Sequence, residues 1–159
     1  MIEINILVLC NVDLENKWGD YSRVFSLMNS LKKNGHNIFI LIIRPEPKKP
    51  RISYLQENGF DIVEIHPFSI GISGKRGILR HLNYLISIPT IMKEASKIIS
   101  KHGIDYVYSY MPGTGSSLPA MKIKSKFKIP LILDLADMYS FIRPKYILNK
   151  SFKEADKII

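Results

Sequence analysis

The stretch Ile4–Cys10, with the sequence INILVLC, decides the fold of this 159-residue chain. It is a continuous apolar run with β-branched members, bounded by polar residues, which is typical of a strand buried on both faces. Apolar residues then recur at helical spacing over 24–31, and Gly35 follows as a left-handed helix cap. A second run, Asn37–Ile43 (NIFILII), repeats the buried-strand pattern. Together these segments predict a β-α-β unit.

The same alternation continues along the chain. The patterns predict a short helix at 52–58, strands at 60–66, 105–109 and 130–134, and helices at about 76–101 and 117–127. Pro89 removes a backbone donor inside the long helix, so we expect a bend there. Repeated strand-helix units with short connections favour a parallel sheet covered on both faces. We therefore predict the fold class α/β, with a doubly wound, mostly parallel Rossmann-like sheet in a three-layer αβα arrangement.

Composition limits the class of protein. With 46% hydrophobic and 23% charged residues, the chain is typical of one globular domain. Its single cysteine, Cys10, cannot form an internal disulfide, and no run reaches the roughly 18 apolar residues that a membrane span needs. The amino terminus lacks the basic flank and cleavage site of a signal peptide, so we expect a cytoplasmic location.

The net charge of the chain is strongly positive. There are 23 Lys and Arg against 14 Asp and Glu, a formal charge of +9. Such a charge favours anionic partners, among which nucleic acid, anionic lipid and nucleotide sugars all qualify, and a solvated lysine-rich surface explains it equally well. No aromatic and basic stripe or recognition-helix pattern is present, so we expect no nucleic-acid partner.

The loop after the first strand holds the first candidate site residues, because ligands bind at the carboxyl ends of the strands in open α/β sheets. Trp18 offers a stacking surface for a sugar ring, Gly19 allows close backbone approach, and Asp20 follows. We predict that all three bind substrate, while a packed anchor for Trp18, a turn for Gly19 and a helix cap for Asp20 stay open. The loop lacks the G-x-G-x-x-G fingerprint, which argues against an NAD enzyme.

The loops after the later strands supply further candidates. Tyr110 offers a hydroxyl and a stacking face, and both it and Gly113 are predicted to bind substrate. Asp137 lies just beyond an apolar strand, where a carboxylate can hydrogen-bond a sugar hydroxyl or orient an acceptor, or else cap a helix. Asp134 ends that strand, so we expect a structural hydrogen bond. For His66, a structural role is favoured over a role in the site.

In this order, the segments resemble the family 4 glycosyltransferases. The family's opening strand, glycine loop, helix and second strand resemble INILVLC, WGD and SLKKNGHNIFILI. DYVYSYMP, IPLILDLADMY and FKEADKII are similar to later segments of the family, so the resemblance covers essentially the whole chain. It implies a two-domain GT-B enzyme whose first Rossmann-like domain binds the acceptor and whose second holds most of the nucleotide sugar. The resemblance also implies that no metal or other cofactor is required.

On that resemblance, residues 1–159 are expected to be the amino-terminal, acceptor-side domain, with the carboxyl-terminal donor-binding domain absent from this chain. Asp156–Ile159 looks like the start of another buried strand, which favours the same interpretation. The full-length protein is expected to be a retaining hexosyltransferase, acting in polysaccharide biosynthesis, with Asp137 in the family's acidic position as the catalytic residue. It would move a sugar from a nucleotide-diphosphate sugar to an acceptor hydroxyl of a glycan or lipid. The chain alone is expected to be inactive.

The family pattern is not matched everywhere. Asp20 replaces a second glycine, Tyr110 stands where a histidine is common, and Ala136 stands where His or Arg is common. Two other functions therefore stay open. One is a flavodoxin-like, non-catalytic binding or signalling module, although His66 stands near the place where such domains carry a phosphorylatable Asp. The other is half of a sugar-nucleotide epimerase with the same two-domain fold.

The long helix carries the clearest signal for a partner. Lys75, Arg76 and Arg80 lie before or within a helical segment that also has an apolar side. A basic amphipathic helix can lie on an anionic membrane, and the resemblance points the same way, so we predict membrane contact by these three residues. A core-packing helix with a solvated basic edge is the alternative. The expected location is thus cytoplasmic and peripheral, on the inner face of the membrane.

Overall fold

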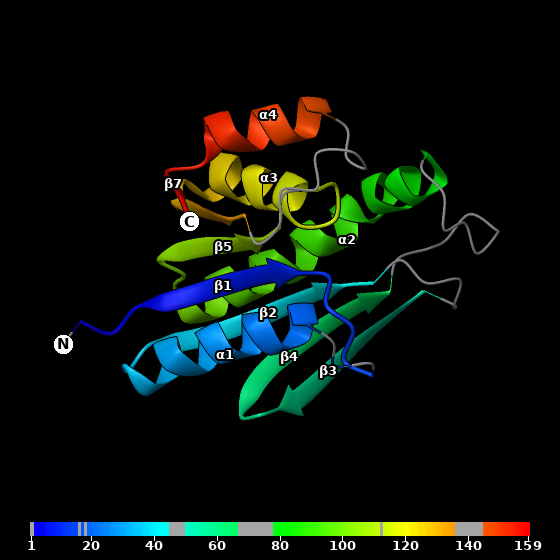
Figure 1. Cartoon of the computed structure of the whole chain (residues 1–159). Coiled ribbons are helices and arrows are strands. Elements are labelled where there is room, and N and C mark those ends of the chain that lie inside the picture. Colours follow the sequence, from blue (N-terminus) through cyan, green and yellow to red (C-terminus); the bar gives the residue numbers. More distant parts are fainter. Residues whose placement is uncertain are drawn as a thin grey trace.

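One twisted sheet, covered by helices on both faces, forms the part of the chain that the structure describes (Figure 1). This computed structural model describes residues 2–15, 17, 19–44, 50–66, 78–111, 113–135 and 145–159, with the backbone alone for 78–80. The strands are β1 (Asn5–Cys10), β2 (Asn37–Ile43), β3 (Arg51–Glu57), β4 (Phe60–His66), β5 (Tyr106–Tyr110), β6 (Leu131–Asp134) and β7 (Lys157–Ile158). The helices are α1 (Gly19–Lys33), α2 (Ile78–His102), α3 (Ser117–Phe127) and α4 (Lys145–Glu154).

The order of the strands sets where a ligand can bind. They lie in the order β3-β4-β2-β1-β5-β6-β7, and all neighbours are parallel except β3 and β4. From β1 the chain passes through α1 to β2 on one side, and it later passes through α2 to β5 on the other. The loops after β1 and β5 therefore diverge at a topological switch point. We call the edge formed by the carboxyl ends of the parallel strands the carboxyl edge.

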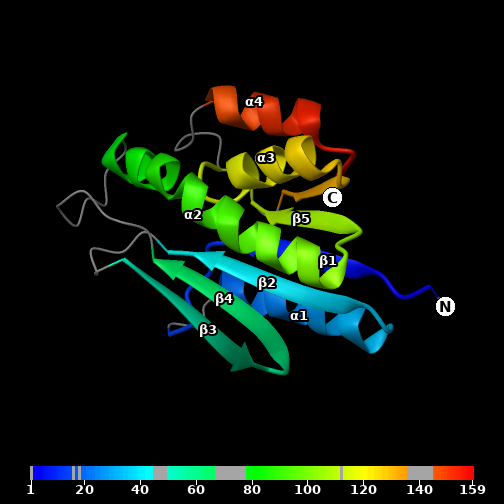
Figure 2. The ribbon, with the colours of Figure 1, turned by 180° about the vertical axis from the view of Figure 1, so that it is seen from behind.

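Each face of the sheet has its own apolar core. On one face α1 packs on β1, β2, β4 and β5, as Val24, Phe25 and Met28 meet Val8 and Ile40. The opposite face is covered by α2 and α3, and α4 lies beside α3, where it also contacts β6 (Figure 2). Leu7 and Leu9 of β1 point into this second core, so β1 is buried on both sides. The two cores confirm the predicted αβα fold class.

One predicted element is wrong. Residues 52–58 form no helix; Arg51–Glu57 is strand β3, which pairs with β4 in antiparallel register. The reason is the turn Asn58-Gly59, whose φ angles of 53° and 75° are both positive, as a two-residue hairpin requires. Asn-Gly is a strong hairpin signal in sequence, and Ile52 and Tyr54 favour a strand.

Other expectations can be compared directly with the structure. Gly35 has a φ of 83° just after α1, which confirms the left-handed cap. The segment expected to begin a buried strand does form β7, but Lys157 and Ile158 are exposed at the edge of the sheet. Among the helices described, none combines the length and the apolar character needed to cross a bilayer.

The turn before α3 generates a test of the packing. A methyl group on Gly115 would lie 2.4 Å from the ring of Tyr84 on α2, whereas one on Gly113 would meet nothing within 4 Å. We therefore expect Gly115→Ala to lower the free energy of unfolding by about 1–3 kcal/mol, because Tyr84 must move. The free energy of unfolding of Gly113→Ala should stay within about 0.5 kcal/mol of the wild-type value. Urea denaturation measures both, and equal losses would contradict this packing.

Candidate functional site

A hydrogen bond crosses the switch point at the carboxyl edge. Tyr110 is the last residue of β5, and Asp20 lies in the first turn of α1, which follows β1. The buried hydroxyl of Tyr110 donates to Oδ1 of Asp20 over 2.9 Å. Asp20 itself is exposed. One carboxylate is thus fixed at the place where an open α/β sheet binds its ligand, with one oxygen left for other donors.

A second carboxylate lies deeper beside this pair. Asp134, which ends β6, is only 1% exposed, so its charge needs partners. Tyr108 donates its hydroxyl to Oδ2, and Arg23 of α1 places Nη2 3.1 Å from Oδ1. This confirms the expected structural hydrogen bond of Asp134. The Arg23 side chain remains 53% exposed, so it still has N–H donors that face solvent.

The environment keeps these groups in defined protonation states. Burial raises the pKa of Tyr110 and of Tyr108 far above the usual value, and the hydrogen bonds to Asp20 and Asp134 raise both pKa values further. The charge of Asp134 raises the pKa of Arg23. At neutral pH both tyrosines therefore stay protonated donors, and Arg23 stays a cation.

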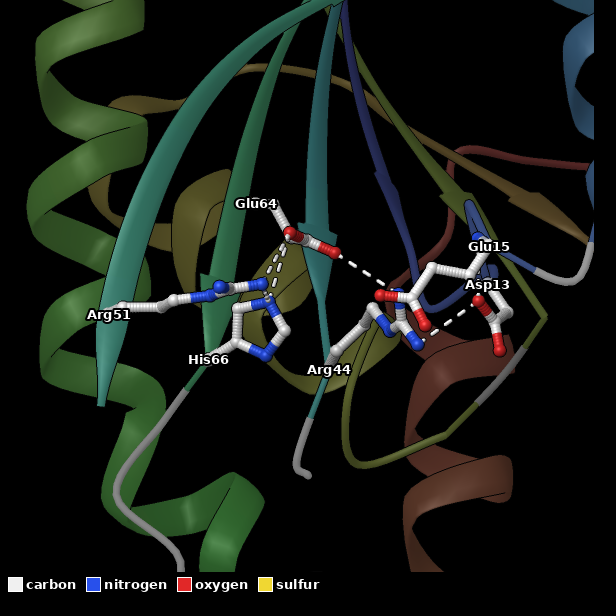
Figure 3. A network of polar contacts seen from close by, with 6 residues as sticks. All are labelled: Asp13, Glu15, Arg44, Arg51, Glu64 and His66. Carbon is white, nitrogen blue, oxygen red and sulfur yellow. Dashed lines mark hydrogen bonds and ion pairs between the residues drawn. The ribbon is translucent and has the colours of Figure 1, made fainter. Parts of the chain in front are cut away.

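A network of charged side chains lies further along the carboxyl edge, toward β4 (Figure 3). Its centre is Glu64 of β4, which is 4% exposed. Arg44, just after β2, places Nη1 3.3 Å from Oε1 of Glu64 and Nη2 3.0 Å from Oδ1 of Asp13 in the loop after β1. On the other side of Glu64, Nε2 of His66 lies 2.9 Å and Nη2 of Arg51 lies 3.8 Å from Oε2.

This network joins strands β3 and β4 to the segments that follow β1 and β2. The buried carboxylate of Glu64 is stabilised by Arg44 and Arg51, and Arg44 in turn holds the loop after β1 through Asp13. His66 is also buried, and within the described residues its Nδ1 has no hydrogen-bond partner. The network therefore has a positioning role: it fixes the first residues of the loop that leads to α1.

The start of α3 forms the remaining part of the carboxyl edge. Oγ of Ser117 accepts from the backbone N–H of Gly113 over 2.8 Å. Nδ1 of His81 on α2 lies 2.7 Å from Oγ1 of Thr114. Met111, which begins the loop, has a φ of 60°, an uncommon value for a residue with a side chain. This loop is therefore held by side-chain contacts, and the Gly113 N–H already has a partner.

The predicted site residues have different outcomes. Gly19, Asp20 and Tyr110 lie together across the switch point, and Gly113 lies in the neighbouring loop after β5. Asp20 follows Gly19 inside the first turn of α1, so it lies within the helix rather than before it. Contact of any of these residues with substrate stays a prediction. Trp18, Lys75, Arg76 and Asp137 lie outside the described residues, as does the side chain of Arg80.

Arg23, Arg44 and Glu64 are not among the predicted site residues. Glu64 interrupts the apolar residues of IVEI at 62–65, and Arg44 follows directly on NIFILII. A charge within or just after a buried strand could have drawn attention to both, because buried charges need partners. No local signal distinguishes Arg23, since its partner Asp134 lies 111 residues away.

Two negative observations concern the described residues alone. Among them, no group of three or more His, Cys, Asp and Glu side chains could hold a metal ion. Burial raises the pKa of the Cys10 thiol to about 12, so this cysteine is a poor nucleophile.

A groove of about 500 Å³ lies away from the carboxyl edge, between α2 and the β3–β4 hairpin. Its lining includes Phe39 and Lys101, toward the amino ends of the parallel strands.

Comparison with known proteins shows similarity of structure only. No family model and no characterised protein matches the sequence. Among solved structures, a protein assigned as UDP-N-acetylglucosamine 2-epimerase from Listeria monocytogenes is similar, with a TM-score of 0.62 and 12% identity over 100% of this chain and 39% of that one.

Two further structures have different activities. An alpha-glucosyltransferase in complex with UDP and DNA matches with a TM-score of 0.56 and 12% identity over 98% of this chain and 37% of its own. The trehalose-6-phosphate protein from E. coli, bound with UDP-2-fluoro glucose, matches with a TM-score of 0.53 and 11% identity. This match covers 97% of this chain and 39% of that one. The chain thus spans about two fifths of the length of these structures. At such identities the similarity establishes a Rossmann-like domain of the GT-B type, and it does not establish family 4.

The charged network generates a test of stability. We expect Glu64→Gln to lower the free energy of unfolding by about 2–3 kcal/mol, somewhat less than a fully broken buried ion pair, because Asp13 still faces Arg44. Asp61→Asn is the matched control: Asp61 lies on the same strand but is exposed, so the change should stay within about 0.5 kcal/mol. Thermal and urea unfolding measure both variants, and an unchanged stability of Glu64→Gln would show that the network is not stabilising.

Proposed function

We propose that this chain is the amino-terminal, acceptor-side domain of a two-domain enzyme that uses a nucleotide sugar, and that the full-length protein is a retaining hexosyltransferase. Its donor is a nucleotide-diphosphate sugar, and its acceptor is a hydroxyl of a glycan or a lipid, as in polysaccharide biosynthesis. No cofactor takes part. The second domain, which would hold most of the donor, lies outside this chain, so the chain alone is inactive.

The observation that carries the proposal is the arrangement of Asp20, Tyr110 and Arg23 at the switch point. The exposed carboxylate of Asp20 is oriented by Tyr110, and it can accept hydrogen bonds from sugar hydroxyls. Arg23, anchored by the buried Asp134, is a cation that can face a phosphate or a sugar oxygen. A carboxylate and a guanidinium, each fixed by a buried partner, suit a substrate with many hydroxyl groups and an anionic donor.

The similar structures support the use of a nucleotide sugar. Two of them contain UDP or a UDP-sugar analogue, one is called an alpha-glucosyltransferase, and this chain covers about two fifths of each. That fraction is the size expected of one half of a two-domain enzyme, which supports the assignment of a companion domain. The resemblance to family 4 adds Asp137, which follows β6 in the sequence, as the catalytic residue in this proposal.

Half of a sugar-nucleotide epimerase is the second candidate. It is favoured by the similar structure assigned as a UDP-N-acetylglucosamine 2-epimerase, which has the highest TM-score of the three described above. The two candidates share the fold and the donor class, but they differ in chemistry: an epimerase inverts a carbon of the nucleotide sugar and needs no acceptor. No comparable observation favours the flavodoxin-like, non-catalytic module.

An experiment on the full-length protein distinguishes the candidates. The protein is incubated with UDP-sugars in D₂O, with and without glycan or lipid acceptors, and the products are followed by NMR. Acceptor-dependent release of UDP with an unchanged anomeric configuration supports the hexosyltransferase. Acceptor-independent inversion with uptake of deuterium supports the epimerase, and failure to bind any nucleotide sugar would overturn both. Turnover by residues 1–159 alone would contradict the two-domain assignment.

Tyr110 provides a test of the switch-point residues. We expect Tyr110→Phe to lower kcat/KM of the full-length enzyme by about tenfold, because Asp20 loses the donor that orients it. Tyr106→Phe is the matched control, since Tyr106 lies at the amino end of the same strand and is 37% exposed. Steady-state kinetics measure the effect. Equal activity of the two variants would place Asp20 and Tyr110 outside the substrate site.

Peripheral membrane contact, through the exposed side of α2, is part of the same proposal. Leu82, Leu85 and Ile86 are 42%, 45% and 44% exposed, and they follow one another at helical spacing. The core is instead contacted by Tyr84, Ile88 and Ile91. In the sequence, the basic residues Lys75, Arg76 and Arg80 are close to this exposed apolar stripe, and such a composition is typical of a surface that lies on anionic lipid, at the inner face of the membrane.

Cosedimentation with liposomes tests this contact. Binding to vesicles rich in anionic lipid, and not to neutral ones, is expected of the wild type. Changing Arg76 and Arg80 to Glu should lower the membrane partition coefficient by about thirtyfold or more, because each basic residue contributes roughly 1 kcal/mol near an anionic surface. Changing both to Lys keeps the charge and should preserve binding. Membrane contact would be excluded if the Glu variant bound as well as the wild type.

A further inference from the structure

The outer edge of β3 is open in the described part of the structure. β3 pairs with β4 on one side, and no described strand lies on the other, so it is an edge of the sheet (Figure 2). Unpaired N–H and C=O groups on such an edge can form hydrogen bonds with another strand. Edge strands are often protected by Lys or Pro, and the sequence RISYLQE contains neither. This edge is therefore competent to pair.

The side chains of β3 are unusually apolar for an exposed strand. Tyr54 is 65% exposed, and Ile52 and Leu55 are 38% and 40% exposed. Tyr54 is also held in place, because its hydroxyl donates to Oε2 of the buried Glu94 on α2 over 2.9 Å. A fixed, exposed aromatic ring with apolar neighbours is a common centre of a protein interface, since little conformational freedom is lost on binding.

The charges of β3 identify the partner. Arg51 begins the strand, Glu57 ends it, and Tyr54 lies midway between them. If a second copy of β3 pairs in antiparallel direction about a twofold axis at Tyr54, each Arg51 lies opposite the Glu57 of the other copy. Leu55 then lies opposite Ser53, and Tyr54 lies opposite itself. No like charges meet in this register, so the strand is complementary to its own copy.

The existing contacts of both charges allow this arrangement. Arg51 lies near His66 and Glu64, but its side chain is 52% exposed. Glu57 faces Lys17 at 2.9 Å and accepts from the hydroxyl of Tyr21 over 2.8 Å, and its side chain is 22% exposed. Both are thus held near the edge without being enclosed. The second copy would add a cation beside Glu57 at each end of the strand pair.

From these observations we infer that β3 is a homodimer interface, in which two copies of the chain join their sheets edge to edge through antiparallel pairing centred on Tyr54. The inference is independent of the proposed enzymatic activity, because β3 lies at the far edge of the sheet from β5 and β6. A short strand pair buries little surface, so the dimer is expected to be weak and reversible.

Sedimentation velocity over a range of concentrations tests self-association. The wild type should pass reversibly from 18.3 kDa to twice that mass. Leu55→Lys places two lysines diagonal to each other and to Arg51 of the other copy, so it should weaken association by tenfold or more. Phe152→Lys on α4 is the matched control, with similar exposure, and should leave association unchanged. A wild type that is monomeric at every concentration, or equal weakening by both variants, would overturn the inference.

Cysteine cross-linking tests the register. Tyr54→Cys should place two thiols directly opposite each other, within reach of a disulfide, because opposite Cβ atoms lie about 4.5–5.5 Å apart. Gln56→Cys should cross-link far more slowly, since two residues at 56 are offset by four positions, or about 13 Å. The native Cys10 is buried and should not contribute. Circular dichroism would confirm that both variants fold, and equal or faster cross-linking at 56 would overturn the register.

Discussion

The burial of β1 on both faces is the constraint on which the rest of the structure depends. Its even-numbered residues, such as Val8, pack under α1, while Leu7 and Leu9 pack under α2 and α3. Its backbone pairs in parallel with β2 on one side and β5 on the other. A parallel strand with both edges paired and both faces covered has no exposed surface to tolerate a shift of register. The switch point follows, because the chain leaves β1 toward β2 on one side and leaves the neighbouring β5 toward β6 on the other side.

The polar groups at the carboxyl edge are arranged by the same constraint. Strand ends from distant parts of the chain meet there, and three of them bring a charge that is costly to bury alone, namely Asp134, Glu64 and Arg44. The solutions are specific pairs: Asp134 with Arg23 and Tyr108, and Glu64 with Arg44. These buried partners make the edge rigid, and they leave Asp20 and part of Arg23 directed to solvent. A surface of this kind, preorganised and only partly neutralised, is suited to binding a polar ligand.

Much of the fold could be predicted from local patterns, because long apolar runs and helical spacing report burial directly. The cap at Gly35 is one example, and strands β1, β2, β4, β5 and β6 are others. The prediction for the segment 52–58 is wrong, since its spacing is compatible with a short helix, and the decisive feature is the Asn58-Gly59 turn at its end. The candidate site was predictable only as a set of loops. Gly19, Asp20 and Tyr110 were identified by their positions after buried strands, but the bond between the last two depends on strand order.

By itself, the sequence determined the α/β class, the buried central strand and the edge of the sheet at which polar loops gather. These features follow from hydrophobic periodicity and turn chemistry, which act over a few residues. Only the tertiary structure decided which side chains meet, as shown by Arg23 with Asp134, 111 residues apart, and by Glu64 between Arg44 and His66. Such contacts depend on strand order and register, and these are set by the packing of the whole sheet rather than by any segment of the chain.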